Sequence, residues 1–328
     1  MESILDLGIK IVLFFQGLGT WLAGAMKLLS FLGQEEFYLL LAPALYWCID
    51  SHAGLRVGLI LMISGCTNTV FKLIFHQPRP YWIDPAVKAY GAETSFGIPS
   101  GHAQNSIAVW GGLAASLKKK GWWILAGILA FLIGLSRVYL GVHFPTDVLL
   151  GWVMGAVLLW LYLKLESRVS AWIKQLRPGV QVGVALTISL AFIALGIIAS
   201  MSLRSWMLPA EWIAHASAAT PDAEPINPTD LSGLVSNGAA FFGLCLGAIM
   251  MAQRGGFDVK GKAWQLVLRY LIGVAGVLIL WAGLRAVFPS GEDMLSYILR
   301  YIRYAAVGFW VTGGATWLFY RLKLAQKP

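Results

Sequence analysis

Three short polar clusters interrupt an otherwise apolar stretch between residues 72 and 147. Fixed cations can hold the negative charge that spreads over the oxygens of a phosphoryl group during its transfer. An imidazole can attack phosphorus or protonate the oxygen that leaves. The clusters therefore contain the parts that phosphoryl transfer needs. The side chains concerned are Lys72, Arg79, His102, Arg137, His143 and Asp147.

The last cluster predicts a nucleophile. His143 and Asp147 stand four residues apart, so they share one face of any helix that includes both. Pro145 suits the first turn of such a helix. Asp147 could accept a proton from one nitrogen of His143 and leave the other nitrogen bare for attack. Arg137, upstream of the pair, can offer a two-pronged contact to phosphate oxygens.

The middle cluster, Pro99-Ser100-Gly101-His102, is typical of a helix start. Ser100 is a favourable N-cap, and Gly101 allows an anion to approach the backbone closely. The free N–H groups of a helix start, with the helix dipole, make an anion site. We therefore expect Ser100 and Gly101 to contact phosphate and His102 to act as the general acid.

The first cluster adds Lys72 and Arg79, each beside the end of an apolar run. One such cation alone is usually an interface anchor whose charged head reaches water. The joint occurrence of three ordered clusters favours a shared site instead. No group of Asp and Glu residues accompanies them to hold magnesium. We therefore expect no metal and no cofactor, and a route through a phosphohistidine.

The composition of the chain indicates the elements that must position these residues. Hydrophobic residues make up 58% of the 328 residues and charged residues only 12%, whereas soluble domains carry about 25% charged residues. Apolar runs near the ~20 residues that span a bilayer recur along the chain. The net charge of +9 comes from basic residues placed between those runs. This pattern indicates an integral membrane protein and argues against a nucleic-acid partner.

The apolar runs predict an all-α, polytopic transmembrane helical bundle of about nine spans plus an amino-terminal interfacial helix. That first helix is amphipathic, because Asp6, Lys10, Thr20 and Lys27 recur at roughly helical spacing. A true span over residues 4–32 stays open as the alternative. The predicted spans are 35–50, 53–75, 101–117, 122–140, 146–164, 179–201, 234–252, 264–288 and 295–320. We expect an interfacial helix in 1–34, a phosphatase core in 35–170 and additional transmembrane helices of unknown role in 171–328.

The charge bias predicts an orientation. The tri-lysine 118–120, the basic residues of 164–177 and 254–262, and the basic tail fall on one side of the membrane under this count of spans. That side should be the cytoplasm. All three polar clusters then face the other side, which in a bacterial-type plasma membrane is the periplasm.

These motifs resemble those of the type 2 phosphatidic acid phosphatase superfamily. The family pattern is Lys-x6-Arg-Pro, then Pro-Ser-Gly-His, then Ser-Arg-x5-His-x3-Asp, and this sequence matches it without a departure. The resemblance implies a helical-bundle core over roughly residues 35–165, with His143 as nucleophile, Asp147 as its partner and His102 as general acid. It also implies that Lys72, Arg79, Ser100, Gly101 and Arg137 bind phosphate.

The function expected is removal of a terminal phosphate from a lipid phosphate or lipid pyrophosphate, with the bilayer as the other partner. The nine-span count and the segment Arg79-Pro80-Tyr81-Trp82 also resemble the glucose-6-phosphatase branch, so a sugar-phosphate phosphatase stays open. A lipid phosphotransferase stays open as well. Remoter alternatives are a non-catalytic transporter or scramblase and a vanadate-dependent haloperoxidase. The specific substrate and the oligomeric state stay open too.

Overall fold

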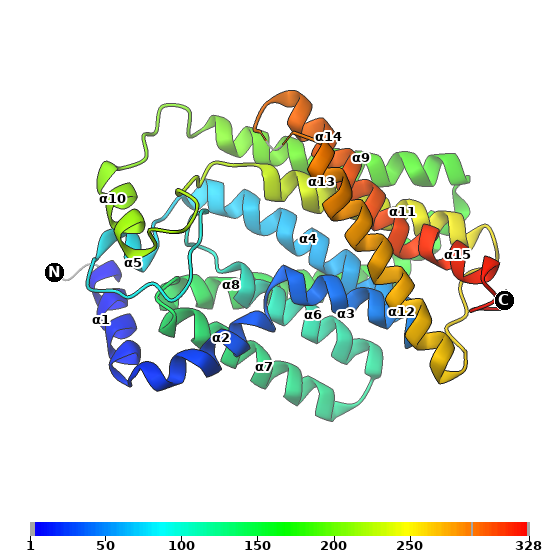
Figure 1. Ribbon diagram of the computed structural model, residues 1–328, viewed down its shortest axis with the longest axis horizontal. Coiled ribbons are helices and arrows are strands. Elements are labelled where there is room, and N and C mark those ends of the chain that lie inside the picture. The colour runs from blue at the N-terminus through cyan, green and yellow to red at the C-terminus, as the bar shows by residue number, and fades with distance from the viewer. Residues whose placement is uncertain (1–3, 290, 327–328) are drawn as a thin grey trace. The chain divides into compact units, whose positions relative to one another are not determined.

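The computed structural model describes residues 4–289 and 291–326, and the regular elements of that part of the chain are all helical (Figure 1). The first are α1 (Ile4–Gly17), the 3-10 turn η1 (Thr20–Leu22), α2 (Ala23–Phe31), α3 (Glu35–Cys48), α4 (Ser51–Phe75) and α5 (Pro80–Ile83). Next come α6 (Gly101–Leu117), α7 (Lys120–Tyr139), α8 (Pro145–Gln175), α9 (Pro178–Met201) and α10 (Ala210–Ala219). The last are α11 (Ser232–Ala252), α12 (Ala263–Leu278), the π-helical η2 (Ile279–Gly283), α13 (Leu284–Val287), α14 (Met294–Phe309), the π-helical η3 (Trp310–Gly314) and α15 (Ala315–Arg321).

The all-α prediction is confirmed over the described residues. The outermost residues of the predicted ranges 1–34 and 171–328, together with Ser290, lie outside the described part of the chain.

Six helical stretches in the described residues are long and apolar enough to cross a membrane. They are Ser51–Ile83, Lys120–Tyr139, Pro145–Gln175, Pro178–Met201, Ser232–Ala252 and Ala263–Val287. Each coincides with one of the nine predicted spans. The predicted spans 35–50 and 101–117 fold as helices of 14 and 17 residues, which is short of the ~20 residues that a perpendicular crossing needs. The predicted span 295–320 is divided by the π-helical turn η3.

The amino-terminal segment differs from the single interfacial helix predicted for it. Ile4–Gly17 and Thr20–Phe31 meet at 85°, and if this bent pair counts as one span the total rises to seven. Gly19, between the two helices, has a φ of 108°. An L side chain rarely adopts that conformation, so glycine permits the sharp bend.

The chain divides into two compact units, which interleave along the sequence. Unit 1 comprises Met1–Phe37, Thr67–Trp160 and Gly196–Asp230. Unit 2 comprises Tyr38–Cys66, Leu161–Leu195 and Leu231–Pro328. All three polar clusters of the sequence belong to unit 1.

Unit 1 brings the start of α8 against the start of α6 without intervening side chains. A Cβ atom added at Gly151 would lie 2.6 Å from the carbonyl oxygen of Ser100. Glycine therefore lets the two backbones touch. Buried amides tie α4 to α6, since Asn68 Nδ2 donates to Gln104 Oε1 at 2.9 Å. These contacts hold the helix starts that carry the polar clusters.

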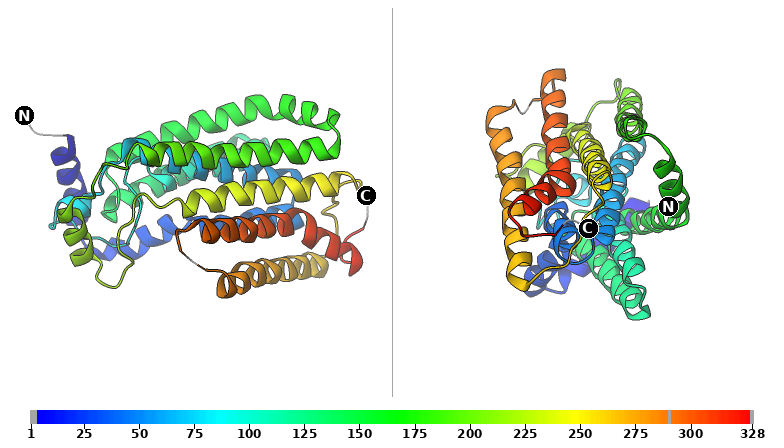
Figure 2. Two further views of the ribbon diagram at one scale, coloured as in Figure 1. Left: turned by 90° about the horizontal axis from the view of Figure 1, so that it is seen from above. Right: turned by 90° about the vertical axis from the view of Figure 1, so that its right-hand side faces the viewer.

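Unit 2 is built in the same way, with α11 packed along α14 (Figure 2). Gly243 faces the carbonyl oxygen of Ala305 directly. Its one fully buried arginine among the described residues, Arg269, donates hydrogen bonds to the main-chain oxygens of Val259, Lys260 and Leu324. Arg269 thereby ties the carboxy-terminal segment to α12.

Candidate active site

His143 and Asp147 meet at the start of α8, where both side chains are almost fully buried. Gly141, with φ of 75°, turns the chain between α7 and His143. The helix begins at Pro145, as predicted, so His143 precedes it rather than sharing its face. The Nδ1 atom of His143 lies 3.2 Å from Asp147 Oδ2, and the backbone N–H of Phe144 donates to that same oxygen at 2.9 Å.

Arg79 defines which nitrogen of His143 carries the proton. Its Nη1 lies 3.2 Å from His143 Nε2. A guanidinium can only donate, so Nε2 is the accepting nitrogen and Nδ1 carries the hydrogen that Asp147 accepts. The bare nitrogen therefore faces the cations. Burial first, and then the neighbouring Arg79 and Arg137, lower the pKa of His143 well below its usual value of 6.5.

Arg79 itself is fully buried and held by the main chain. Its guanidinium donates to the carbonyl oxygens of Ser95 at 2.7 Å, Val142 at 2.8 Å and Phe96 at 3.1 Å. It also donates to the hydroxyl of Ser95 at 3.2 Å, and Lys72 Nζ donates to that hydroxyl at 2.7 Å. Two of the predicted phosphate ligands are thus joined through one serine.

The start of α6 has the predicted cap. Ser100 is the N-cap, and its hydroxyl accepts from the backbone N–H of Ala103 at 3.4 Å. The backbone N–H of Ser100 donates to the carbonyl oxygen of Asp147 at 2.9 Å, which joins the second and third clusters. A Cβ at Gly101 would lie 3.2 Å from Asn68 Oδ1, so glycine suits this close approach.

Arg137, in the last turn of α7, is bound on two sides. Its guanidinium donates to Ser30 Oγ at 2.6 Å and forms an ion pair with the carboxylate of Glu93. The Nε atom of Arg137 and the Nε2 atom of His102 are buried and have no hydrogen-bond partner within the described residues. Buried polar nitrogens without partners cost free energy. A phosphate held between them would satisfy both.

Glu93 is the site residue that no sequence pattern singled out. It lies in the loop between α5 and α6, and its carboxylate is 3.6 Å from Arg79 as well as paired with Arg137. Burial alone would raise the pKa of Glu93, but the cations, Arg79 and Arg137 foremost, outweigh it and hold that pKa well below its usual range. The carboxylate thus lies where a phosphate would meet the same cations. The sequence feature that could have indicated Glu93 is its position as an acidic residue between two basic clusters.

Unit 1 therefore gathers all eight residues predicted for the site. They are Lys72, Arg79, Ser100, Gly101, His102, Arg137, His143 and Asp147. Direct contacts join Arg79, His143, Asp147 and Ser100. Ser95 links Lys72 to Arg79, and Glu93 links Arg137 to Arg79. His102 lies within electrostatic range of Glu93, Arg137 and Lys72. A cationic cluster that holds one unprotonated imidazole nitrogen and a second imidazole nearby has the groups needed to bind an oxyanion, attack it and protonate a leaving group.

Comparison with protein-family models gives two matches. Residues 53–171 match the model described as "PAP2 superfamily". Residues 235–327 match the model described as "PAP2 superfamily phosphatase, transmembrane extension". The first match contains all three polar clusters. Neither match includes residues 172–234.

Three relatives illustrate the range of similar proteins. Phosphatidylglycerophosphatase B of Bacillus subtilis is 33% identical over 162 residues, which are 45% of this chain and 77% of that protein. Undecaprenyl-diphosphatase of Sulfolobus acidocaldarius is 33% identical over 149 residues, which are 44% of this chain and 71% of that protein. Human glucose-6-phosphatase 3 is 31% identical over 186 residues, which are 49% of this chain and 54% of that protein.

Proposed function

The chain belongs to the PAP2 superfamily of membrane phosphatases, and from this we propose that it removes a terminal phosphate from a lipid phosphate or lipid pyrophosphate. The observation that carries the proposal is the unprotonated Nε2 of His143, whose ring is fixed by Asp147 at Nδ1 and by Arg79 at Nε2. The names of the lipid-phosphate relatives support the substrate class. The protein is an integral membrane protein with several apolar helices, so lipid tails can stay in the bilayer while the headgroup reaches the site.

In the proposed first step, Nε2 of His143 attacks phosphorus and the bond from phosphorus to the leaving oxygen breaks. His102 gives its proton to that oxygen, and a bound phosphate dianion favours the charged form of His102 beforehand. Asp147 keeps Nδ1–H in place and stabilises the positive charge that the ring acquires. The products are a phosphohistidine and the dephosphorylated alcohol or lipid phosphate.

In the proposed second step, water attacks the phosphohistidine and the bond from nitrogen to phosphorus breaks. His102, now neutral, takes the proton of the attacking water. Lys72, Arg79 and Arg137 hold the oxygens of the phosphoryl group through both steps, and the N–H groups at Ser100 and Gly101 add the anion site of a helix start. Inorganic phosphate leaves and His143 is restored.

We further propose that the site opens on the extracytoplasmic face, the periplasmic side of a bacterial-type plasma membrane. Its support is that Ser100–His102 and the tri-lysine 118–120 flank opposite ends of α6. Under this proposal α3, α6 and α14–α15 complete nine spans. The ranges 1–34, 35–170 and 171–328 remain proposed as an interfacial segment, now formed by α1 and α2, a phosphatase core and additional transmembrane helices.

Phosphate release by the purified protein in EDTA tests the function. The substrates are phosphatidate, phosphatidylglycerol phosphate, undecaprenyl pyrophosphate, sphingosine phosphate and glucose 6-phosphate, each with wild type and His143→Ala. We expect release from lipid substrates, its loss in the variant, and an acid-labile phosphoenzyme in wild type alone. Release that persists in His143→Ala would contradict the phosphohistidine route.

The second candidate function is a sugar-phosphate phosphatase, which the similarity to human glucose-6-phosphatase 3 favours. Release from glucose 6-phosphate alone would establish that branch. Transfer of phosphate to an added lipid alcohol, without release to water, would indicate a phosphotransferase instead.

A further inference from the structure

Ser95 lies in the loop between α5 and α6, outside the motif positions, and two cations of the candidate site bind its side chain. Lys72 Nζ donates to the hydroxyl oxygen at 2.7 Å, and Arg79 Nη2 donates to the same oxygen at 3.2 Å. A serine hydroxyl has two acceptor positions and one hydrogen to donate, whereas ammonium and guanidinium groups only donate. Both acceptor positions of Ser95 are therefore occupied, and its hydrogen points away from the cations.

The hydroxyl hydrogen of Ser95 has no acceptor within the described residues, because Lys72 and Arg79 are the hydrogen-bond partners of Oγ there. Ser95 is only half-buried, so it is not sealed off from an incoming group. A hydroxyl whose oxygen accepts from two cations is polarised, which strengthens it as a donor. Ser95 therefore presents an unused donor beside the cations of the candidate site.

The guanidinium of Arg79 relates this donor to the nucleophile. One terminal nitrogen, Nη1, lies 3.2 Å from His143 Nε2, and the other, Nη2, lies 3.2 Å from Ser95 Oγ. Nη2 is also 3.6 Å from a carboxylate oxygen of Glu93. The imidazole, the carboxylate and the hydroxyl thus surround one planar group. A phosphoryl group that replaces the carboxylate within reach of Nε2 would bring an oxygen next to Ser95.

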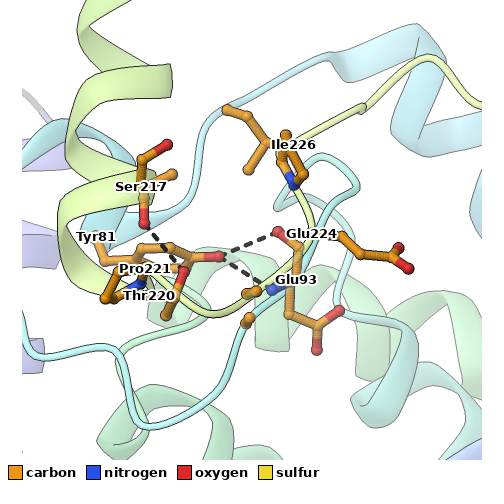
Figure 3. A pocket seen from close by; sticks show the side chains of 11 residues that line it. Tyr81, Glu93, Ser217, Thr220, Pro221, Glu224 and Ile226 are labelled. Carbon is orange, nitrogen blue, oxygen red and sulfur yellow. Dashed lines mark hydrogen bonds between the residues drawn. The ribbon is translucent and has the colours of Figure 1, made fainter.

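The loop that carries Ser95 is fixed in the absence of a ligand. Two residues upstream, the hydroxyl of Tyr81 donates to the carbonyl oxygen of Glu93 and accepts from its N–H, both at 3.1 Å (Figure 3). Arg79 donates to the carbonyl oxygens of Ser95 at 2.7 Å and of Phe96 at 3.1 Å. A donor held in this way needs no reorganisation when charge develops on a phosphoryl oxygen, which makes it effective in catalysis.

We propose that Ser95 is a further catalytic residue, whose hydroxyl donates a hydrogen bond to a non-bridging oxygen of the phosphoryl group during its transfer. The proposal rests on the phosphatase function proposed above. No covalent bond to Ser95 forms or breaks, and its hydrogen stays on Oγ. The hydroxyl stabilises the same negative charge that Lys72 and Arg79 stabilise.

A purely structural role of Ser95 is the competing account, because the same hydroxyl also holds Lys72 beside Arg79. Arg79 does not depend on that hydroxyl, since its guanidinium is bound by the carbonyl oxygens of Ser95, Phe96 and Val142. The ammonium group of Lys72, in contrast, has the Ser95 hydroxyl as its one hydrogen-bond partner within the described residues. The experiment must therefore separate a donor to phosphate from a support for Lys72.

The kinetic measurement compares Ser95→Ala and Ser95→Thr with wild type, as full-length protein in detergent with the substrate that wild type hydrolyses fastest. Ser95→Ala should lower kcat by about tenfold to a hundredfold with KM changed by less than about threefold, because the lost bond is strongest in the transition state. Ser95→Thr keeps a hydroxyl and should recover most of kcat. The control Thr94→Val removes the hydroxyl one residue away, keeps the backbone bond from Asn227, and should leave kcat unchanged.

Binding of orthovanadate tests the donor without turnover. Calorimetric titration of wild type, Ser95→Ala, Lys72→Ala and the double variant gives four dissociation constants. Ser95→Ala should weaken vanadate binding about tenfold in the wild-type background and still about threefold or more in the Lys72→Ala background. A support for Lys72 alone predicts no further loss in the double variant.

The outcomes for Ser95 and for the phosphatase function are distinguishable. Phosphate release that His143→Ala abolishes supports the function, whatever Ser95 does. Absence of release from every substrate, with vanadate binding that depends on Ser95 in both backgrounds, would contradict the function and support Ser95 as an oxyanion ligand.

Three results would overturn the role of Ser95. The first is an unchanged kcat in Ser95→Ala. The second is a double variant that binds vanadate as tightly as Lys72→Ala alone. The third is an equal loss of kcat in Ser95→Ala and Ser95→Thr with Tm lowered in both, which would show that the side chain acts by packing.

Discussion

At the scale of single residues, His143 is held by two hydrogen bonds, one from Arg79 to Nε2 and one from Nδ1 to Asp147. The arginine holds Nε2 as an acceptor, and the aspartate holds Nδ1 as a donor. The imidazole is therefore kept in one tautomer before any substrate arrives. Glu93 balances the charge of Arg79 and Arg137 in the substrate-free site. Under the proposed function, an incoming phosphate competes with that carboxylate for the two arginines.

Glu93→Gln should bind inorganic phosphate or orthovanadate about tenfold more tightly than wild type, which corresponds to about 1.4 kcal/mol. The reason is that the neutral amide competes less well for the two guanidiniums. The inhibition constants of both oxyanions provide the measurement, with Glu211→Gln as the matched control. Weaker binding in Glu93→Gln would mean that the carboxylate supports phosphate rather than competing with it.

The pH profile should show an acid limb of kcat/KM below 6.5. The neutral imidazole of His143 is the attacking form, and its pKa is lowered, so activity is lost only as pH falls through that lowered value. The profile must be corrected for the second ionisation of the substrate phosphate near pH 6. An acid limb above 6.5 in the free enzyme would contradict the assignment of His143.

The same shift affects stability. Below pH 6.5 the unfolded chain binds a proton at His143 that the folded protein does not. The free energy of unfolding therefore decreases as pH falls from about 6.5 toward the folded pKa.

At the scale of elements, the site depends on two helix starts that touch through their backbones. Gly151 of α8 lies against the carbonyl oxygen of Ser100, and the N–H of Ser100 donates to the carbonyl oxygen of Asp147. The residues proposed as general acid and nucleophile, His102 and His143, are thus positioned by one contact between α6 and α8. A shift of either helix would move His102 relative to His143.

Gly151→Ala should lower both Tm and kcat, because its Cβ would lie 2.6 Å from the Ser100 oxygen and force the helices apart. A displacement of this size near the chemistry can reduce kcat by up to ~100-fold. The matched control is Gly127→Ala in α7, whose Cβ would meet nothing within 4 Å and which should retain kcat and gain slightly in Tm. Equal effects of the two substitutions would contradict the close-contact account.

The sequence predicts those elements whose ends carry a local signal. Ser100 and Pro145 mark the starts of α6 and α8, and six of the nine predicted spans coincide with helical stretches long and apolar enough to cross a membrane. It does not predict α10, which lies in the predicted polar loop 202–233. In that helix, the ring of Trp212 packs against the rings of Trp82 and Trp206. The hydrophobic periodicity of a sequence does not predict contacts between segments so far apart. Glu93 was not predicted because it lies far from Arg137 in the sequence, and only the fold of its loop brings its carboxylate to Arg79 and Arg137.

At the scale of the whole molecule, each of the two units has its own buried arginine network. Every group of the proposed catalytic site lies in unit 1. In unit 2, Arg269 satisfies its guanidinium with main-chain oxygens, and Arg56 pairs with Glu166 at 2.7 Å. The residues that stabilise unit 2 are thus separate in the chain from those proposed to act on substrate.

Arg269→Lys should lower Tm while kcat/KM per folded molecule stays within about twofold of wild type. An ammonium group cannot reproduce the planar fork that reaches Val259, Lys260 and Leu324. Thermal unfolding in detergent gives Tm, and titration of active sites with vanadate normalises the rate. A large loss of kcat/KM at unchanged Tm would show that unit 2 contributes directly to catalysis.

The hydrogen bonds from Arg79 to the carbonyl oxygens of Ser95, Phe96 and Val142 have an evolutionary consequence. Main-chain acceptors do not change when side chains do, so no compensating substitution can arise for them. Arg79 should therefore tolerate almost no replacement in a deep mutational scan, while its three acceptor positions accept other residues that fit the same path of the chain. Covariation between positions would detect none of these contacts, because the guanidinium is held by main-chain oxygens and not by the side chains of the three acceptor residues.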